Sequence, residues 1–125
     1  MRKLDELLDI QPKKRVEINE ARKPLLMDIT TKKDSFSKGD TVDKISFEEK
    51  RGMYYARLHI GSQSFIVKAQ NLHRYLKGYA KPPTMNKLEK MMSDAVATTV
   101  TGQRTEPDGT GSDGSPSWLL AMGLI

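Results

Sequence analysis

Basic side chains are the groups in this sequence with the clearest potential for chemistry, and they are concentrated in its middle third. Residues 53–92 hold seven Lys and Arg, one acid and both histidines, in a chain of 125 residues whose formal net charge is +5. Residues 1–52 are nearly balanced in charge, and residues 93–125 are net acidic. Such a concentration favours a polyanionic partner through long-range attraction. The alternative is a solvated surface that only keeps a small protein soluble.

The first candidate site lies on segments that alternate polar with apolar or aromatic residues. Tyr55, Arg57 and His59 occupy alternate positions of one segment. Lys68 occupies a position of the next segment that would face the same way. Because successive side chains of a strand point to opposite faces of a sheet, we expect all four on one face. Aromatic and basic groups there can stack on bases and neutralise phosphates. In the alternative interpretation, an amino-terminal helix covers this face and Tyr55 and Ile66 belong to the core.

The second candidate site lies on the exposed sides of two predicted helices. Arg74 and Lys77 fall opposite an apolar stripe at helical spacing over residues 72–79, and Lys87 and Lys90 fall on the exposed side of the following helix. With little acid to offset them, these four side chains are candidates for phosphate contacts. Basic residues on a helix surface are also commonly just solvated.

An apolar plug near the carboxyl terminus is a separate candidate for binding a protein. Trp118 and Leu119 follow a Gly-rich segment at 106–114. The plug can fold back onto the chain's own core, since burial of one large side chain contributes roughly 1.5–3 kcal/mol. Alternatively, it docks into a partner or a second copy of the chain.

Patterns typical of enzymes, metal sites and cofactor sites do not occur. The chain has no cysteine, and His59 and His73 have no acidic residue close by in the sequence. Asp108 and Asp113 lie in a Gly-rich loop without the spacing or the closing Glu of an EF-hand. Phosphate-loop and nucleophile-elbow motifs are missing as well. We therefore expect no catalytic residues, no metal and no cofactor. One alternative is left open: His59 could meet Ser46 or Ser64 across strands, although no third group is in view to orient the imidazole, and residues distant in the sequence can converge in an enzyme.

The periodicities predict a single α+β domain. They favour a small antiparallel sheet of three or four strands packed against one helix, with a carboxyl-terminal helix-hairpin-helix extension. Turns at 50–52 and 61–62 separate three strands, a helix over 72–79 covers their apolar face, and Thr84 caps a helix over 85–95. A hairpin over 98–105 and a short helix capped by Ser115 follow. We divide the chain into an amino-terminal segment with a helix at 3–10 (1–40), a meander with its helix (41–81) and the extension (82–125).

Three resemblances bear on this interpretation. The segment from Pro83 to Pro107, with Pro83-Thr84-Met85-Asn86-Lys87 and Thr99-Val100-Thr101-Gly102-Gln103, loosely resembles an excisionase-type winged helix. That resemblance implies that Asn86, Lys87 and Lys90 would enter the major groove and that Arg104 would lie on the wing. A three-stranded meander followed by a helix resembles the layout of AP2-type DNA-binding domains. The tail, with Glu106-Pro107-Asp108-Gly109 and Ser115-Pro116-Ser117-Trp118, resembles the ends of small, functionally unassigned phage and bacterial proteins.

The sequence thus favours a small, non-enzymatic nucleic-acid-binding regulator or accessory protein of a phage or mobile element. Its expected partner is DNA or RNA, with contacts from Tyr55, Arg57, His59, Lys68, Arg74, Lys77, Lys87 and Lys90. The alternative is an inhibitor or adaptor that docks its basic face on a host protein, with Trp118 and Leu119 as anchors. The absence of cysteine and of long apolar runs leads us to expect a cytoplasmic protein without a membrane partner. Homodimerisation is left open.

Overall fold

The computed structural model describes residues 22–125, so the helix predicted at 3–10 lies outside the described residues. Its largest sheet is an antiparallel meander of β5 (Lys44–Lys50), β6 (Met53–Ile60) and β7 (Gln63–Lys68). The two-residue turn between β5 and β6 has positive φ at Arg51 (53°) and Gly52 (80°). Positive φ at both positions matches the twist of the flanking strands, which explains why Gly occupies the second. The Gly52 N–H also donates to Glu49 Oε2 at 2.6 Å.

One face of the meander carries two hydrophobic cores, one towards each end. The first core forms around Ile45, Leu58 and Phe65, which lie opposite one another in register. It is closed by the helix α2 (Leu72–Tyr75), which follows a 3₁₀ turn, η2 (Ala69–Asn71). Two small antiparallel pairs complete it, β1 (Lys23–Pro24) with β4 (Thr41–Val42), and β2 (Ile29–Thr30) with β3 (Ser35–Phe36). Leu25 and Phe36 from this region are buried in it.

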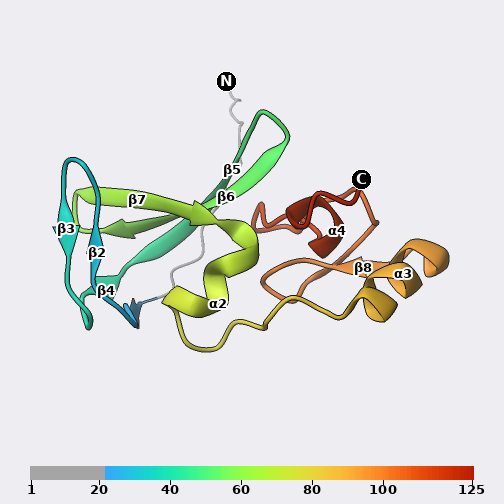
Figure 1. The fold of residues 1–125 in the computed structure, drawn as a ribbon, viewed down its shortest axis with the longest axis horizontal. Helices are drawn as coiled ribbons and strands as arrows, with labels where there is room; N and C mark the ends of the chain where they lie inside the picture. The colour runs from blue at the N-terminus through green and yellow to red at the C-terminus, as the bar shows by residue number, and fades with distance from the viewer. Residues whose placement is uncertain (1–21) are drawn as a thin grey trace, which may run out of the picture.

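The second core joins the other end of the same sheet face to the carboxyl-terminal part of the chain. Phe47 and Tyr54 pack there against a cluster that contains Leu88, Trp118 and Leu119. The elements of this part are α3 (Met85–Asp94), β8 (Ala97–Thr98), β9 (Arg104–Thr105) and α4 (Trp118–Ala121). They lie beside the meander, as Figure 1 shows, and residues 76–84, which we call the connector, run from α2 to α3.

The predicted fold class, one sheet packed against one helix with a helix-hairpin-helix extension, is wrong. The described strands form four separate sheets, and two of the three α-helices have only four residues. The stripe over 72–79 does not continue as a helix, because Leu76 is already extended (φ −135°, ψ 137°). The carbonyl of Tyr75, which a longer helix would use, accepts instead from the Leu26 N–H at 2.9 Å. A partner 49 positions away in the chain therefore ends the helix.

Caps explain where the other two helices begin. The Thr84 side chain accepts from the Lys87 N–H, which confirms the predicted cap of α3. The cap of α4 is Ser117, whose Oγ accepts from the Leu120 N–H at 3.1 Å, and not Ser115 as the sequence suggested. Ser115 is fully buried in a hydroxyl cluster instead, where its Oγ donates to Asp113 Oδ1 at 2.5 Å.

Candidate nucleic-acid interface

The face of the meander that points away from both cores, here called the outward face, carries four of the predicted site residues. Tyr55, Arg57 and His59 follow one another along β6, and Lys68 pairs with Tyr55 across β7. The same face includes Lys44, Ser46 and Glu48 of β5 in register with them. The period-two pattern therefore placed these residues on one surface, as predicted. Tyr55 is half-buried and Lys68 is exposed.

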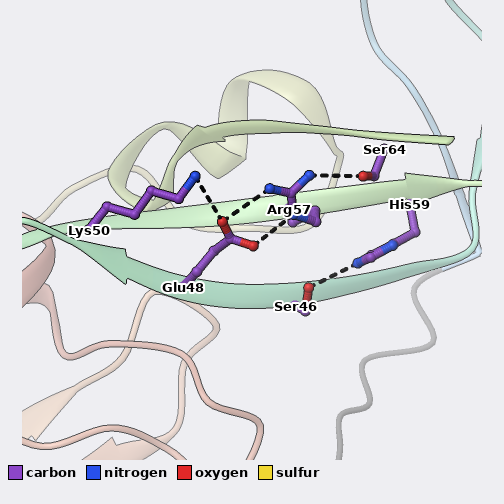
Figure 2. A network of polar contacts seen from close by, with 6 residues as sticks. All are labelled: Ser46, Glu48, Lys50, Arg57, His59 and Ser64. Atoms are coloured by element: carbon purple, nitrogen blue, oxygen red, sulfur yellow. Dashed lines mark hydrogen bonds and ion pairs between the residues drawn. The ribbon is translucent and has the colours of Figure 1, made fainter.

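Arg57 is the centre of a polar network on this face (Figure 2). Its Nε donates to Glu48 Oε2 at 2.7 Å and its Nη2 to Glu48 Oε1 at 3.1 Å, a bidentate pair, while Nη1 donates to Ser64 Oγ at 2.9 Å. The hydrogen bonds from Arg57 hold the pKa of Glu48 below its ordinary value, and Glu48 in turn raises the pKa of Arg57. The Lys50 ammonium lies 3.5 Å from the same carboxylate. Glu48 therefore offsets much of the positive charge that the sequence assigned to Arg57.

His59 shares a hydrogen bond with Ser46, with 2.9 Å between Nε2 and Oγ. Burial lowers the pKa of His59 from its ordinary value, and the nearby charges of Lys44 and Arg57 lower it further. The imidazole is therefore neutral at physiological pH. It offers a hydrogen bond or a ring face to a ligand, but no positive charge.

The four predicted residues on the helices lie on a different surface. Leu72 of α2 packs on the apolar face of the meander, and Arg74, on the same short helix, is exposed. Lys77 on the connector and Lys87 on α3 are exposed as well, whereas Lys90 lies 3.5 Å from Asp94. The structure thus divides the eight predicted residues between the outward face and the opposite side of the sheet, and it does not join them into one site.

Exposed cations follow one another in the chain along α2, the connector and α3. We define the basic strip by its four exposed residues, Arg74, Lys77, Lys81 and Lys87. None of the four makes an ion pair with any residue from 22 to 125. The sequence has no Asp or Glu between Lys50 and Leu88. Unlike Arg57, the strip therefore presents uncompensated positive charge.

Lys23 is a cation beside the strip that the sequence interpretation missed. Its Nζ donates to the carbonyl oxygen of Lys77 at 2.8 Å and lies 5.1 Å from the centroid of the Tyr79 ring. Gly78 makes this approach possible, because a Cβ at that position would come within 2.6 Å of Lys23 Nζ. No local signal could have revealed this contact, since Lys23 is 54 residues from its acceptor.

A small cavity lies next to the connector and was also not predicted. It has a volume of about 220 Å³ and is lined by Gly78, Tyr79 and Ala80 on one side, by residues 98–102 on the other, and by Trp118. Burial, followed by the negative charge of Asp113, raises the pKa of Tyr79, so its hydroxyl keeps its proton. The predicted hairpin over 98–105 was interpreted as a wing, but its turn forms a wall of this cavity.

The predicted protein-binding anchors point inwards. Trp118 is 3% exposed and Leu119 is fully buried, both in the second core. The exposed apolar side chains of the carboxyl-terminal part belong to α3 and the segment directly after it, with Met85, Met92 and Val96, and to the end of the sequence, with Leu124 and Ile125.

Within residues 22–125, no three His, Asp or Glu side chains gather in a way that could hold a metal ion. No helix in this part of the chain is both long enough and apolar enough to span a bilayer. In comparisons with protein-family models, curated proteins and solved structures, none was found to match this chain.

Proposed function

We propose that this protein binds nucleic acid through the basic strip. The observation that carries the proposal is the set of four exposed cations, Arg74, Lys77, Lys81 and Lys87, with no acidic partner among the described residues. Phosphate contacts from Lys and Arg release counterions, and this release supplies most of the affinity of non-specific complexes. A regulator or accessory protein of a phage or mobile element would use such binding without catalysis.

The outward face supports the proposal less strongly. Its central arginine is held by Glu48 and Ser64, and His59 is neutral, so Lys44 and Lys68 are its cations without an ion pair among residues 22–125. A phosphate that approached Arg57 would compete with a bidentate carboxylate. Tyr55 and the exposed Ile66 could still contact bases or sugars of a strand that reached this face.

The test is fluorescence anisotropy with labelled single-stranded DNA, duplex DNA and RNA across a salt series. Binding through four strip cations predicts a slope of log K against log salt of about −3 for a single strand, from about −0.7 per phosphate contact. The double variant Arg74→Glu/Lys77→Glu should weaken binding to all three ligands. Both side chains are exposed and make no hydrogen bond within residues 22–125, so the fold should persist.

The matched control is Lys32→Glu/Lys33→Glu, which changes the net charge equally at the exposed turn between β2 and β3. A larger effect at the strip than at this turn supports a local interface. Equal effects would mean that only net charge matters, and no binding at low salt would contradict the proposed function.

Protein binding, as an inhibitor or adaptor, is the second candidate function. It is favoured by the exposed apolar side chains of Met85 (59% exposed), Met92 (48%) and Val96 (42%). Methionine-rich surfaces adapt to varied partners. Capture of one host protein that survives nuclease treatment, and is lost in Met85→Ser/Met92→Ser, would favour this function over nucleic-acid binding.

A further inference from the structure

We propose that the ligand of the basic strip is single-stranded, and that one unstacked base inserts into the cavity beside the connector. This inference rests on the proposed function and adds the ligand class and the place where a base is bound. It follows from three features, which are the position of the cavity, the charges around it and the chemistry of its walls.

The cavity and the basic strip share the connector. Gly78, Tyr79 and Ala80 line the cavity, and the strip residues Lys77 and Lys81 immediately precede and follow these three residues in the chain. Lys23 adds a third cation through its contact with the Lys77 carbonyl and the Tyr79 ring. We therefore expect a polyanion held by Lys77 and Lys81 to run along the cavity-lining residues between them.

The walls of the cavity suit a flat heteroaromatic ring. Tyr79 supplies most of the aromatic surface, since Trp118 also lines the cavity but is only 3% exposed, and residues 98–102 supply backbone polar groups. The Thr99 and Thr101 hydroxyls are already engaged, since Thr99 Oγ1 accepts from the Gln103 N–H and Thr101 Oγ1 donates to Asp113. The Tyr79 hydroxyl has no hydrogen-bond partner among residues 22–125 and keeps its proton, so it can donate to a base edge.

The size of the cavity restricts what it holds. Its volume of about 220 Å³ is smaller than the roughly 300–1,000 Å³ of pockets that hold whole drug-sized ligands. We therefore expect one ring system to enter it, with the sugar and the phosphate remaining outside. A paired base would first have to leave the duplex stack at a cost in free energy, so a single strand is the favoured ligand.

The experiment uses the intrinsic fluorescence of Trp118, which is the only tryptophan of the full chain and lines the cavity. Titration with an unlabelled single-stranded oligonucleotide should quench this fluorescence, with the same midpoint as anisotropy reports for binding. An abasic oligonucleotide of equal length should bind through its phosphates without the quench. Duplex DNA should bind more weakly than the single strand and leave Trp118 fluorescence unchanged.

A variant that fills the cavity gives an independent test. Ala80→Phe enlarges an exposed residue at the wall, and Ser37→Phe makes the same kind of change on an exposed turn outside the cavity as the matched control. Base stacking is worth about 1–3 kcal/mol per base, so Ala80→Phe should weaken single-strand binding roughly tenfold and abolish the quench. Ser37→Phe should do neither, and circular dichroism checks that both variants fold.

The outcomes separate the inference from the proposed function. Anisotropy that reports binding while Trp118 fluorescence does not change, with Ala80→Phe equal to wild type, would overturn base insertion and leave strip binding intact. If neither signal responds to any nucleic acid at low salt, the proposed function fails and the inference fails with it.

Discussion

The Lys23 ammonium donates to the main-chain carbonyl of Lys77 at 2.8 Å, and this contact ties the first described strand to the connector. Lys23 pairs through β1 with β4, so the connector is held against the same region that closes the first core. The half-buried Lys23 thus positions residues 78–80, which lie between the strip residues Lys77 and Lys81.

Lys23→Met is expected to loosen the connector while keeping most of the aliphatic stem. Loss of the hydrogen bond and of the cation–π contact should lower the free energy of unfolding by about 1 kcal/mol. Single-strand binding should weaken several-fold because the variant removes a cation beside the strip and releases the connector at Lys77. Urea denaturation and anisotropy measure the two effects, with Lys38→Met, an exposed lysine elsewhere, as the control. Equal stability and affinity in both variants would contradict the role given to Lys23.

The Glu48–Arg57 pair should make the stability of the protein depend on acidic pH. The pKa of Glu48 is lowered from its ordinary value of 4.5, first by the hydrogen bonds from Arg57, so the folded state binds this proton more weakly than the unfolded state. The contribution to stability is therefore complete above about pH 4.5 and is lost as the pH falls through the folded pKa. Because both side chains are partly exposed, we expect at most about 1 kcal/mol.

Chemical denaturation of wild type and Glu48→Gln between pH 3 and pH 7 tests this expectation. The difference between the two proteins should be largest near neutral pH and shrink towards pH 3. Glu89→Gln, on the exposed side of α3, serves as the control and should run parallel to wild type. A Glu48→Gln difference that stays constant with pH would show that the carboxylate charge is not what matters.

His59 should titrate below its ordinary pKa of 6.5, because burial penalises the charged ring and Lys44 and Arg57 repel it. The unfolded chain then binds this proton more readily, so stability decreases as the pH falls below 6.5. An NMR titration of the ring protons measures the folded pKa directly. In Lys44→Gln that pKa should rise but stay below 6.5, since burial is the largest cause, while Lys32→Gln should leave it unchanged. A folded pKa at or above 6.5 would refute this account.

Local periodicity was enough to predict the meander and its faces. The alternation over 44–68 places Ile45, Leu58 and Phe65 in the core and Tyr55 and Arg57 on the outward face, as the structure has them. The period of two follows from the strand backbone itself, so neighbouring residues carry the signal. The cap of α3 by Thr84, an interaction between residues fewer than four positions apart, was also predicted correctly.

Apart from the cap of α4, which is Ser117 and not Ser115, what the sequence did not predict depends on partners far apart in the chain. The end of α2 depends on Leu26, the charge of Arg57 on Glu48, and the connector on Lys23. The cavity combines residues 78–80, residues 98–102 and Trp118. Periodicity has no information about such pairs. The fold class failed for the same reason, since one apolar sheet face was expected to take one helix and in fact carries two cores.

The hydroxyl cluster around Asp113 should stabilise the carboxyl-terminal part of the chain. Asp113 accepts from Thr101 Oγ1 at 2.7 Å and from both the N–H and the hydroxyl of Ser115, which is fully buried. This network lies beside the turn of residues 98–102 that lines the cavity. Asp113→Ala removes the acceptor that Thr101 and Ser115 share and leaves the buried Ser115 hydroxyl with Thr101 Oγ1, 2.9 Å away, as its partner, so the loss of these hydrogen bonds should cost about 1–3 kcal/mol.

Asp113→Ala should therefore lower the free energy of unfolding by about 2 kcal/mol in urea denaturation. Amide hydrogens that close the loop, those of Gly111 and Ser117, should exchange faster, because their bonds to Ser115 and Gly109 depend on the loop staying closed. Asp108→Ala, an exposed acid in the same loop, provides the control and should change neither quantity. Unchanged exchange at Gly111 and Ser117 in Asp113→Ala would mean that other contacts hold the loop, and that the wall of the cavity does not depend on this carboxylate.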